Sequence, residues 1–131
     1  MPNGHTGTSA DWQRIEAPLL ELDPLLETFA RRHHVRLAKN ERDWPSRSLT
    51  REFGIRRLMQ IHVHDPGSPT FDVWLCASQD CFGKGYWKNR YVAEDVDAHA
   101  LAVQMAHALG PGYAELMSWR RKDLVYATDL G

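Results

Sequence analysis

The segment from Leu49 to Val63 alternates in hydropathy with a period of two, and no other feature constrains the fold as strongly. The even positions are polar or small apart from Leu58, whereas the odd positions are mostly apolar: Leu49, Phe53, Ile55, Met59, Ile61 and Val63. Such alternation predicts a β-strand with one buried face. Gly54 lies within this run and predicts either a bulge or a split into two strands.

Two more strands are expected after this run. Residues 70–78 place Phe71, Val73 and Leu75 on one face, and residues 86–92 form the next alternating segment. The stretch from Asp65 to Pro69 has the composition of a turn. Because the connections are short, the strands are predicted to form an antiparallel meander.

Helices are expected before and after this meander in the chain. Asp23 and Pro24 are typical of a helix start, so a helix is predicted from there to about His34, after a short one near Asp11. A second helix is expected over 94–109 and a third over 113–122, with a possible edge strand at 124–126. The predicted fold is α+β: a three- to four-stranded antiparallel meander packed on one face by helices, in the order α-β-β-β-α-α. Residues 1–10 are expected to be a polar tail, and 11–131 a single α+β domain.

Composition limits the classes of function. The net charge of -1 excludes a strong overall attraction to nucleic acid or to an anionic membrane, so nucleic acid is a disfavoured partner. No apolar run reaches the about 20 residues that span a bilayer. Two cysteines and no apolar leader predict a cytoplasmic protein with reduced thiols.

The charges are unevenly distributed along the chain. Residues 31–57 are strongly basic, whereas residues 11–27 are mainly acidic. We expect these two segments to neutralise each other in the fold.

The alternation also predicts how the strands pair. In the first hairpin, His62 lies opposite Asp72 and Gln60 opposite Trp74, which brings the apolar residues together on the other face. In the second hairpin, the expected register places Trp74 beside Arg90, with Lys88 beside Cys76. Trp87 and Tyr91 would then belong to the core.

The face turned away from this core is the main candidate for function. Its cations and aromatic rings suit a small anionic or aromatic ligand, through charge, stacking and cation–π contact. The predicted ligand-binding residues are Arg56, Gln60, His62, His64, Asp72, Trp74, Tyr86, Lys88 and Arg90. The alternative is a solvated face, or one that a helix or a second subunit covers.

His62, His64 and Asp72 are the weak candidates for a metal site, and also for a hydrolase or metal-dependent enzyme. Cys76 cannot join them, since it lies about 13 Å along the strand at 3.3 Å per residue. No nucleophile is expected beside the His62–Asp72 pair. A non-catalytic module without a cofactor is therefore favoured.

The predicted helix over 94–109 is apolar on two sides. Such a helix is either sandwiched within the fold, which is favoured, or lies at a contact with another protein. The second reading makes the chain a protein-interaction module or a homodimer. Its interface candidates are Val96, Ala100, Val103 and His107.

Overall fold

The structure is a computed structural model that describes residues 9–81 and 84–126. The strands are β1 (Arg36–Lys39), β2 (Arg47–Phe53), β3 (Ile55–Asp65), β4 (Thr70–Cys81), β5 (Lys84–Val96) and β6 (Val125–Tyr126). The main helices are α1 (Ser9–His33), α2 (Ala98–His107) and α3 (Tyr113–Ser118). A π-helical turn (Ala108–Gly112) joins α2 to α3, and a 3-10 turn (Arg121–Asp123) precedes β6.

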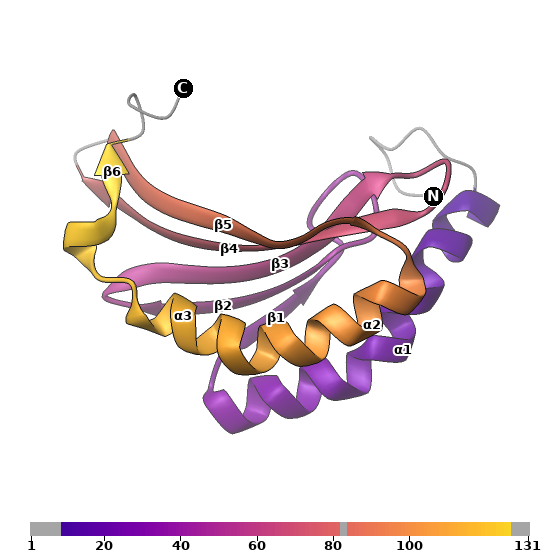
Figure 1. Cartoon of the computed structure of the whole chain (residues 1–131), viewed down its shortest axis with the longest axis horizontal. Coiled ribbons are helices and arrows are strands. Elements are labelled where there is room, and N and C mark those ends of the chain that lie inside the picture. The colour runs from indigo at the N-terminus through magenta and orange to yellow at the C-terminus, as the bar shows by residue number, and fades with distance from the viewer. Residues whose placement is uncertain (1–8, 82–83, 127–131) are drawn as a thin grey trace.

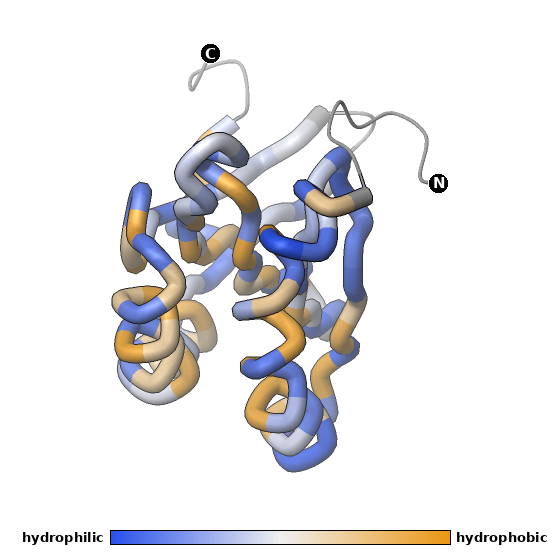
Figure 2. Tube along the Cα trace, turned by 90° about the vertical axis from the view of Figure 1, so that its right-hand side faces the viewer, coloured by the Kyte–Doolittle hydropathy of each residue, from blue (hydrophilic) through white to orange (hydrophobic). Residues whose placement is uncertain are grey.

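The six strands form one antiparallel sheet whose spatial order equals the chain order, β1-β2-β3-β4-β5-β6. The helices all lie on one side of the sheet, and the sheet curves so that its other side is concave (Figure 1). Viewed along their axes, the helices lie side by side below the sheet (Figure 2). The predicted α+β class and the packing of helices on one face are confirmed.

The strand count was predicted too low, for two reasons. The alternating run is split at Gly54, which has a φ of +74° between β2 and β3, a backbone conformation that suits glycine. The short strand β1 was missed, because two of its four residues are charged and no alternation is visible over such a length. The edge strand near 124–126 is present as β6.

Helix α1 continues through both Pro18 and Pro24, so the predicted start at Asp23 is wrong. Apolar residues at helical spacing bury its inner face: Ile15, Leu19, Leu22, Leu26 and Phe29. Burial of this stripe outweighs the cost of two prolines, since tertiary packing supplies most helical stability. The strands contribute the facing half of the core: Leu49, Ile55, Met59, Ile61, Phe71, Val73, Leu75 and Ala77.

Asp23 is a buried partner of Arg47 rather than a helix cap. The Arg47 side chain is 1% exposed, and its Nε and Nη2 donate to the Asp23 carboxylate at 2.7 and 3.1 Å. Its remaining donors reach Glu16, Asn40 and the Ser46 carbonyl. The acidic and basic segments thus neutralise each other here, as the sequence predicts.

Three further arginines on the helix-facing side of the sheet attach the helices to it. Arg51 donates to the His33 carbonyl at the end of α1. Arg57 donates to the carbonyls of Leu116 and Trp119 at the end of α3. Arg90 pairs with Glu115 of α3. These contacts satisfy carbonyls and charges that the helix termini would otherwise leave without partners.

Helix α2 is not sandwiched within the fold, contrary to expectation. Leu101 and Met105 pack on the sheet, and the opposite side of the helix faces outward, with Val103 61% exposed. Asp97 caps this helix by accepting the Ala100 N–H at 2.9 Å.

Candidate functional site

The concave face of the sheet is built first by the β3–β4 hairpin, whose register was predicted correctly up to Val63; the expected pairing of His64 with Thr70 was wrong, because Asp65 pairs with Thr70. Gln60 pairs with Trp74 and His62 with Asp72, so these side chains lie on the concave face. A register shift between Val63 and Asp65 takes His64 out of the regular ladder. Arg56 and Cys76 lie on the same face, further along the hairpin.

The β4–β5 register was predicted one residue out, and this reverses the faces of β5. Trp74 pairs with Tyr91, not Arg90, and Ser78 pairs with Trp87. Because side chains alternate along a strand, a slip of one residue exchanges all of them between the two faces. Trp87 and Tyr91 therefore lie on the concave face, not in the core.

Lys88 and Arg90 consequently do not belong to the concave face, whereas Tyr86 still borders it at the end of the sheet. The Lys88 ammonium lies 5.2 Å from the Trp119 ring, and Arg90 binds Glu115, both on the helix-facing side. Tyr86 packs against the core and lies under Arg121 of the 3-10 turn, at 4.0 Å. The concave face is thus less basic and more aromatic than the sequence suggested.

Three rings form an aromatic platform at the centre of this face: His62, Trp74 and Tyr91. The Trp74 and Tyr91 rings are stacked with centroids 6.0 Å apart and planes 28° apart, and His62 meets Trp74 edge-on at 6.0 Å. The Trp74 indole N–H donates to the Gln60 side-chain oxygen at 2.8 Å, which fixes the indole plane. Tyr91 remains 40% exposed.

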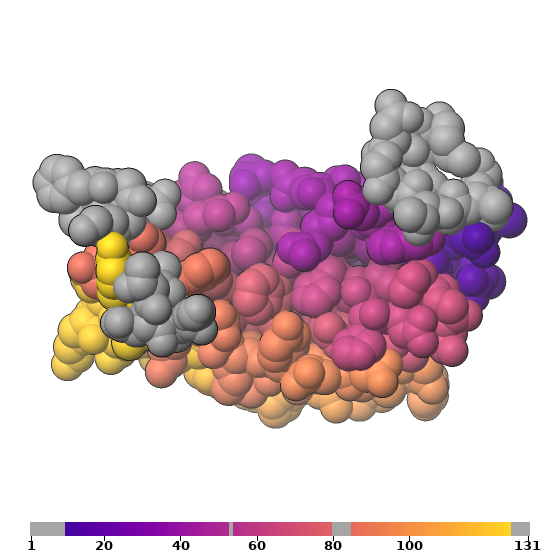
Figure 3. Space-filling model, turned by 90° about the horizontal axis from the view of Figure 1, so that it is seen from above, coloured from indigo at the N-terminus to yellow at the C-terminus, as the bar shows by residue number. Residues whose placement is uncertain are grey.

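Beside the platform lies a cleft of about 620 Å³, called here the aromatic cleft. It opens on the concave face, which Figure 3 shows from above. Its lining residues come from β3, β4, β5 and the turn before β3: Gly54, Arg56, Leu58, Trp74, Cys76, Ser78, Gln79, Gly85, Tyr86 and Trp87. Burial raises the pKa of the Cys76 thiol, only partly offset by Arg56, and this favours the protonated, neutral thiol.

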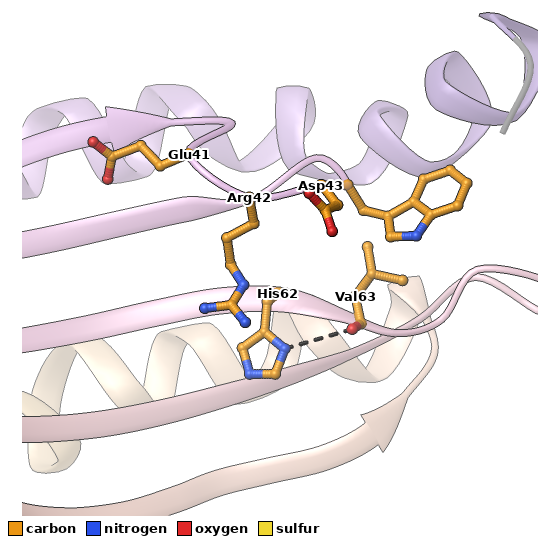
Figure 4. Close-up of a pocket in the computed structure, with 6 residues that line it drawn as sticks. Glu41, Arg42, Asp43, His62 and Val63 are labelled. Carbon is orange, nitrogen blue, oxygen red and sulfur yellow. Dashed lines mark hydrogen bonds between the residues drawn. The ribbon is translucent and has the colours of Figure 1, made fainter. Parts of the chain in front are cut away.

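A second cavity of about 370 Å³, called here the loop cavity, lies at the other side of the platform. It is bounded by His62 and Val63 of β3 and by the connection between β1 and β2 (Figure 4). From that connection Glu41, Arg42, Asp43 and Trp44 line it. No sequence pattern selects Arg42, because only the fold brings this loop over β3.

The Asp72 carboxylate connects two irregular strand segments, one in β3 and one in β5. Its buried carboxylate accepts from His64 Nδ1 at 2.9 Å and from the Asp95 N–H at 2.8 Å. His64 follows the register shift in β3, and Asp95 has a φ of +54° in the irregular end of β5. His62 is further away, with its Nδ1 3.8 Å from the carboxylate. Among the side chains that the structure describes, no three of the acidic, histidine or cysteine type are grouped to hold a metal ion.

The pKa values of His62 and His64 are expected to shift in opposite directions from that of an ordinary histidine. Burial lowers the pKa of His62, whereas the hydrogen bond to Asp72 raises the pKa of His64. A histidine NMR titration should place the His64 midpoint above the ordinary value and that of His62 below it. Asp72→Asn should bring the His64 midpoint down, because it removes the charged acceptor. Equal midpoints in the unsubstituted protein would contradict this arrangement.

The same shift predicts how His64 affects stability with pH. Because the pKa of His64 is higher in the folded than in the unfolded protein, protonated His64 stabilises the folded protein. This stabilisation is complete at a pH below the unfolded-state pKa, and it is lost as the pH rises through the folded-state pKa.

The interface candidates on and before α2 do not share one surface environment. Val96 packs partly against the core, and Ala100 is half-buried. Val103 and His107 are exposed. Val103 is therefore the one large apolar side chain that these four candidates offer to a partner.

Comparison with protein-family models, with curated proteins and with solved structures finds no match. None of the helices that the structure describes is long and apolar enough to cross a membrane.

Proposed function

We propose that this chain is a small non-catalytic binding module whose aromatic cleft receives a ligand with a flat, largely apolar body. The observation that carries the proposal is the aromatic cleft itself, where Trp74 and Trp87 border a volume of about 620 Å³ beside a stacked Trp74–Tyr91 pair. Small-molecule sites are typically concave, between roughly 300 and 1,000 Å³, and lined by apolar and aromatic groups with a few polar ones.

The exposure of the aromatic rings supports this proposal. Trp87 and Tyr91 are 38% and 40% exposed, on the side of the sheet that α1, α2 and α3 leave uncovered. Covering such rings with a planar ligand removes apolar area from water and adds stacking. Leu58 and the neutral thiol of Cys76 extend the apolar floor, and Arg56 is the charged group among the lining residues that the structure describes.

The proposal is tested with two fluorescent probes that share one aromatic body. N-phenylnaphthylamine is uncharged, and anilinonaphthalene sulfonate carries an anionic group. Trp87→Ala should weaken the binding of both probes by roughly tenfold, because loss of a stacking ring costs about 1–3 kcal/mol. Fluorescence titration measures both affinities.

Trp12→Ala is the matched control, because Trp12 lies on α1 and is not part of the cleft lining. It should leave both affinities unchanged. The proposal fails if neither probe binds, or if Trp87→Ala and Trp12→Ala have the same effect on affinity. Melting curves of each variant show whether a lost signal reflects unfolding.

The aromatic cleft is preferred over the two other functions that the sequence raised. A contact through α2 has a weaker basis, because Val103 alone among its candidates combines size with exposure. A hydrolase at His62, His64 and Asp72 has a weaker basis too, because the Asp72 carboxylate is already used by His64 and the Asp95 N–H.

A further inference from the structure

We infer that the loop cavity is an anion-binding subsite, in which Arg42 and His62 bind an anionic group attached to the aromatic ligand. This inference rests on the proposed function and narrows it. The ligand class becomes a planar aromatic carboxylate, sulfonate or phosphate rather than any flat apolar molecule.

The first support is that the loop bearing Arg42 is held at its base. Asn40, at a φ of +60°, donates its N–H to the Ser46 carbonyl at 2.9 Å, and its side-chain oxygen accepts the Ser46 N–H at 3.1 Å. The same oxygen accepts from buried Arg47 at 3.0 Å. The loop is therefore closed by three hydrogen bonds, and its outer residues are presented over β3 in a defined position.

The second support is the state of the Arg42 guanidinium. Among the residues that the structure describes, its hydrogen-bond partner is the neutral Gln60 side-chain oxygen, at 3.4 Å, and no carboxylate lies within ion-pair distance of it. Neighbouring Glu41 turns away from it (Figure 4) and accepts from Ser48 at 3.3 Å. A guanidinium without a carboxylate partner is suited to a planar, charge-assisted contact with an incoming acid.

The third support is that Gln60 links the subsite to the aromatic platform. Its side-chain oxygen accepts from both the Trp74 indole N–H and Arg42 Nη1. His62 belongs to both places, since it meets Trp74 edge-on at 6.0 Å and also lines the loop cavity. A ligand whose rings lie on Trp74 can therefore extend its acidic group towards Arg42 and His62.

His62 adds a dependence on pH to this subsite. The groups that face it are Arg42 and Asp43 from the loop, His64 from its own strand, Asp72 from β4 and Tyr91 from β5. Burial chiefly, together with the positive charge of Arg42, lowers the pKa of His62, so the ring is neutral at neutral pH. A bound anion offsets both effects and favours the protonated ring. Binding then takes up a proton, and affinity for the anion falls as the pH rises through the His62 titration.

The test compares the same two probes, because only one of them carries an anion. Arg42→Gln should weaken anilinonaphthalene sulfonate by about tenfold, as expected for loss of a charge-assisted contact of about 1.4 kcal/mol, and should leave N-phenylnaphthylamine unchanged. Asp43→Asn should strengthen sulfonate binding, because it removes an opposing charge from the same cavity. His62→Gln should remove the decline in sulfonate affinity with rising pH. The sulfonate does not titrate in this range, so the pH dependence reports the protein.

Arg31→Gln is the matched control, because Arg31 is an exposed arginine of α1, on the other side of the sheet. The inference is overturned if Arg42→Gln and Arg31→Gln affect the sulfonate equally while Trp87→Ala still weakens both probes. That result leaves the aromatic cleft standing. If Trp87→Ala instead leaves the affinities for both probes unchanged, the proposed function is contradicted, and the proposed subsite with it.

Discussion

Replacing Arg47 with alanine is expected to lower the free energy of unfolding by about 3–5 kcal/mol. The substitution leaves the Asp23 carboxylate, which is 9% exposed, without its 2.7 Å partner, and Glu16 loses its contact as well. Lys39, 3.3 Å from Asp23, remains as a partly exposed replacement. Urea denaturation of the variant at neutral pH measures the loss.

Two further variants separate the ion pair from the packing. Arg31→Ala removes an exposed arginine of α1 and should change the free energy of unfolding by less than about 0.5 kcal/mol. Arg47→Met combined with Asp23→Leu should recover most of the loss, because the buried Asp23 carboxylate is removed together with its partner. A loss below about 1 kcal/mol in Arg47→Ala would show that Arg47 is not buried as described.

The Asp23–Arg47 pair also makes the stability of the protein depend on pH. Burial alone would raise the pKa of Asp23, but the hydrogen bond and charge of Arg47, with those of Lys39, outweigh it and lower the pKa. A lowered folded-state pKa stabilises the protein above the ordinary carboxyl pKa. This contribution is lost as the pH falls through the lower, folded-state value, that is, below about 4.

Trp119→Ala is expected to lower the free energy of unfolding by about 3–5 kcal/mol, and Trp87→Ala by about 1 kcal/mol or less. Both substitutions remove the same atoms. Trp119 is 5% exposed on the helix-facing side, with Lys88 over its ring, whereas Trp87 is 38% exposed on the concave face. Chemical denaturation of the two variants under one set of conditions makes the comparison.

This pair of variants also tests the register of β5. With the register expected from the sequence, Trp87 would lie in the core, and its removal would cost as much as that of Trp119. A small effect of Trp87→Ala agrees with the pairing of Ser78 with Trp87. A large effect would place Trp87 in the core and remove it from the aromatic cleft.

The sequence predicted the β3–β4 hairpin residue for residue up to Val63, because both strands alternate cleanly and a register slip would bury polar groups. It failed for β5, where aromatic and basic residues alternate and either set can be read as the buried one. Asn89 carried the corrective signal: the expected register placed this polar residue on the core side, and the observed one pairs it with Cys76 on the concave face. Long cations such as Lys88 and Arg90 can face helices when those helices supply Trp119 and Glu115.

The candidate site was only partly predictable for a related reason. Gln60, His62 and Trp74 were placed together correctly, because they belong to one hairpin. Arg42 was not, because its position depends on a loop that is fixed by Asn40 and buried Arg47. Those contacts join residues whose pairing no local pattern reveals. The helix predicted in place of α1 was too short for a comparable reason. Prolines normally interrupt helices, and only the packing of α1 against the sheet shows that Pro18 and Pro24 do not.

The equality of strand order and chain order has a consequence for how the protein folds. From β1 to β5, each strand pairs with the next one along the chain, and the connections between them are short. Chain entropy lost on closing a loop grows with its length, so each of these pairings forms at a small entropic cost. There are two exceptions. Helix α1 depends on the contact of its Asp23 with Arg47 of β2, and β6 pairs with β5 only after the chain has passed through α2 and α3. We therefore expect the central hairpins to form early and the two chain ends to dock onto them late.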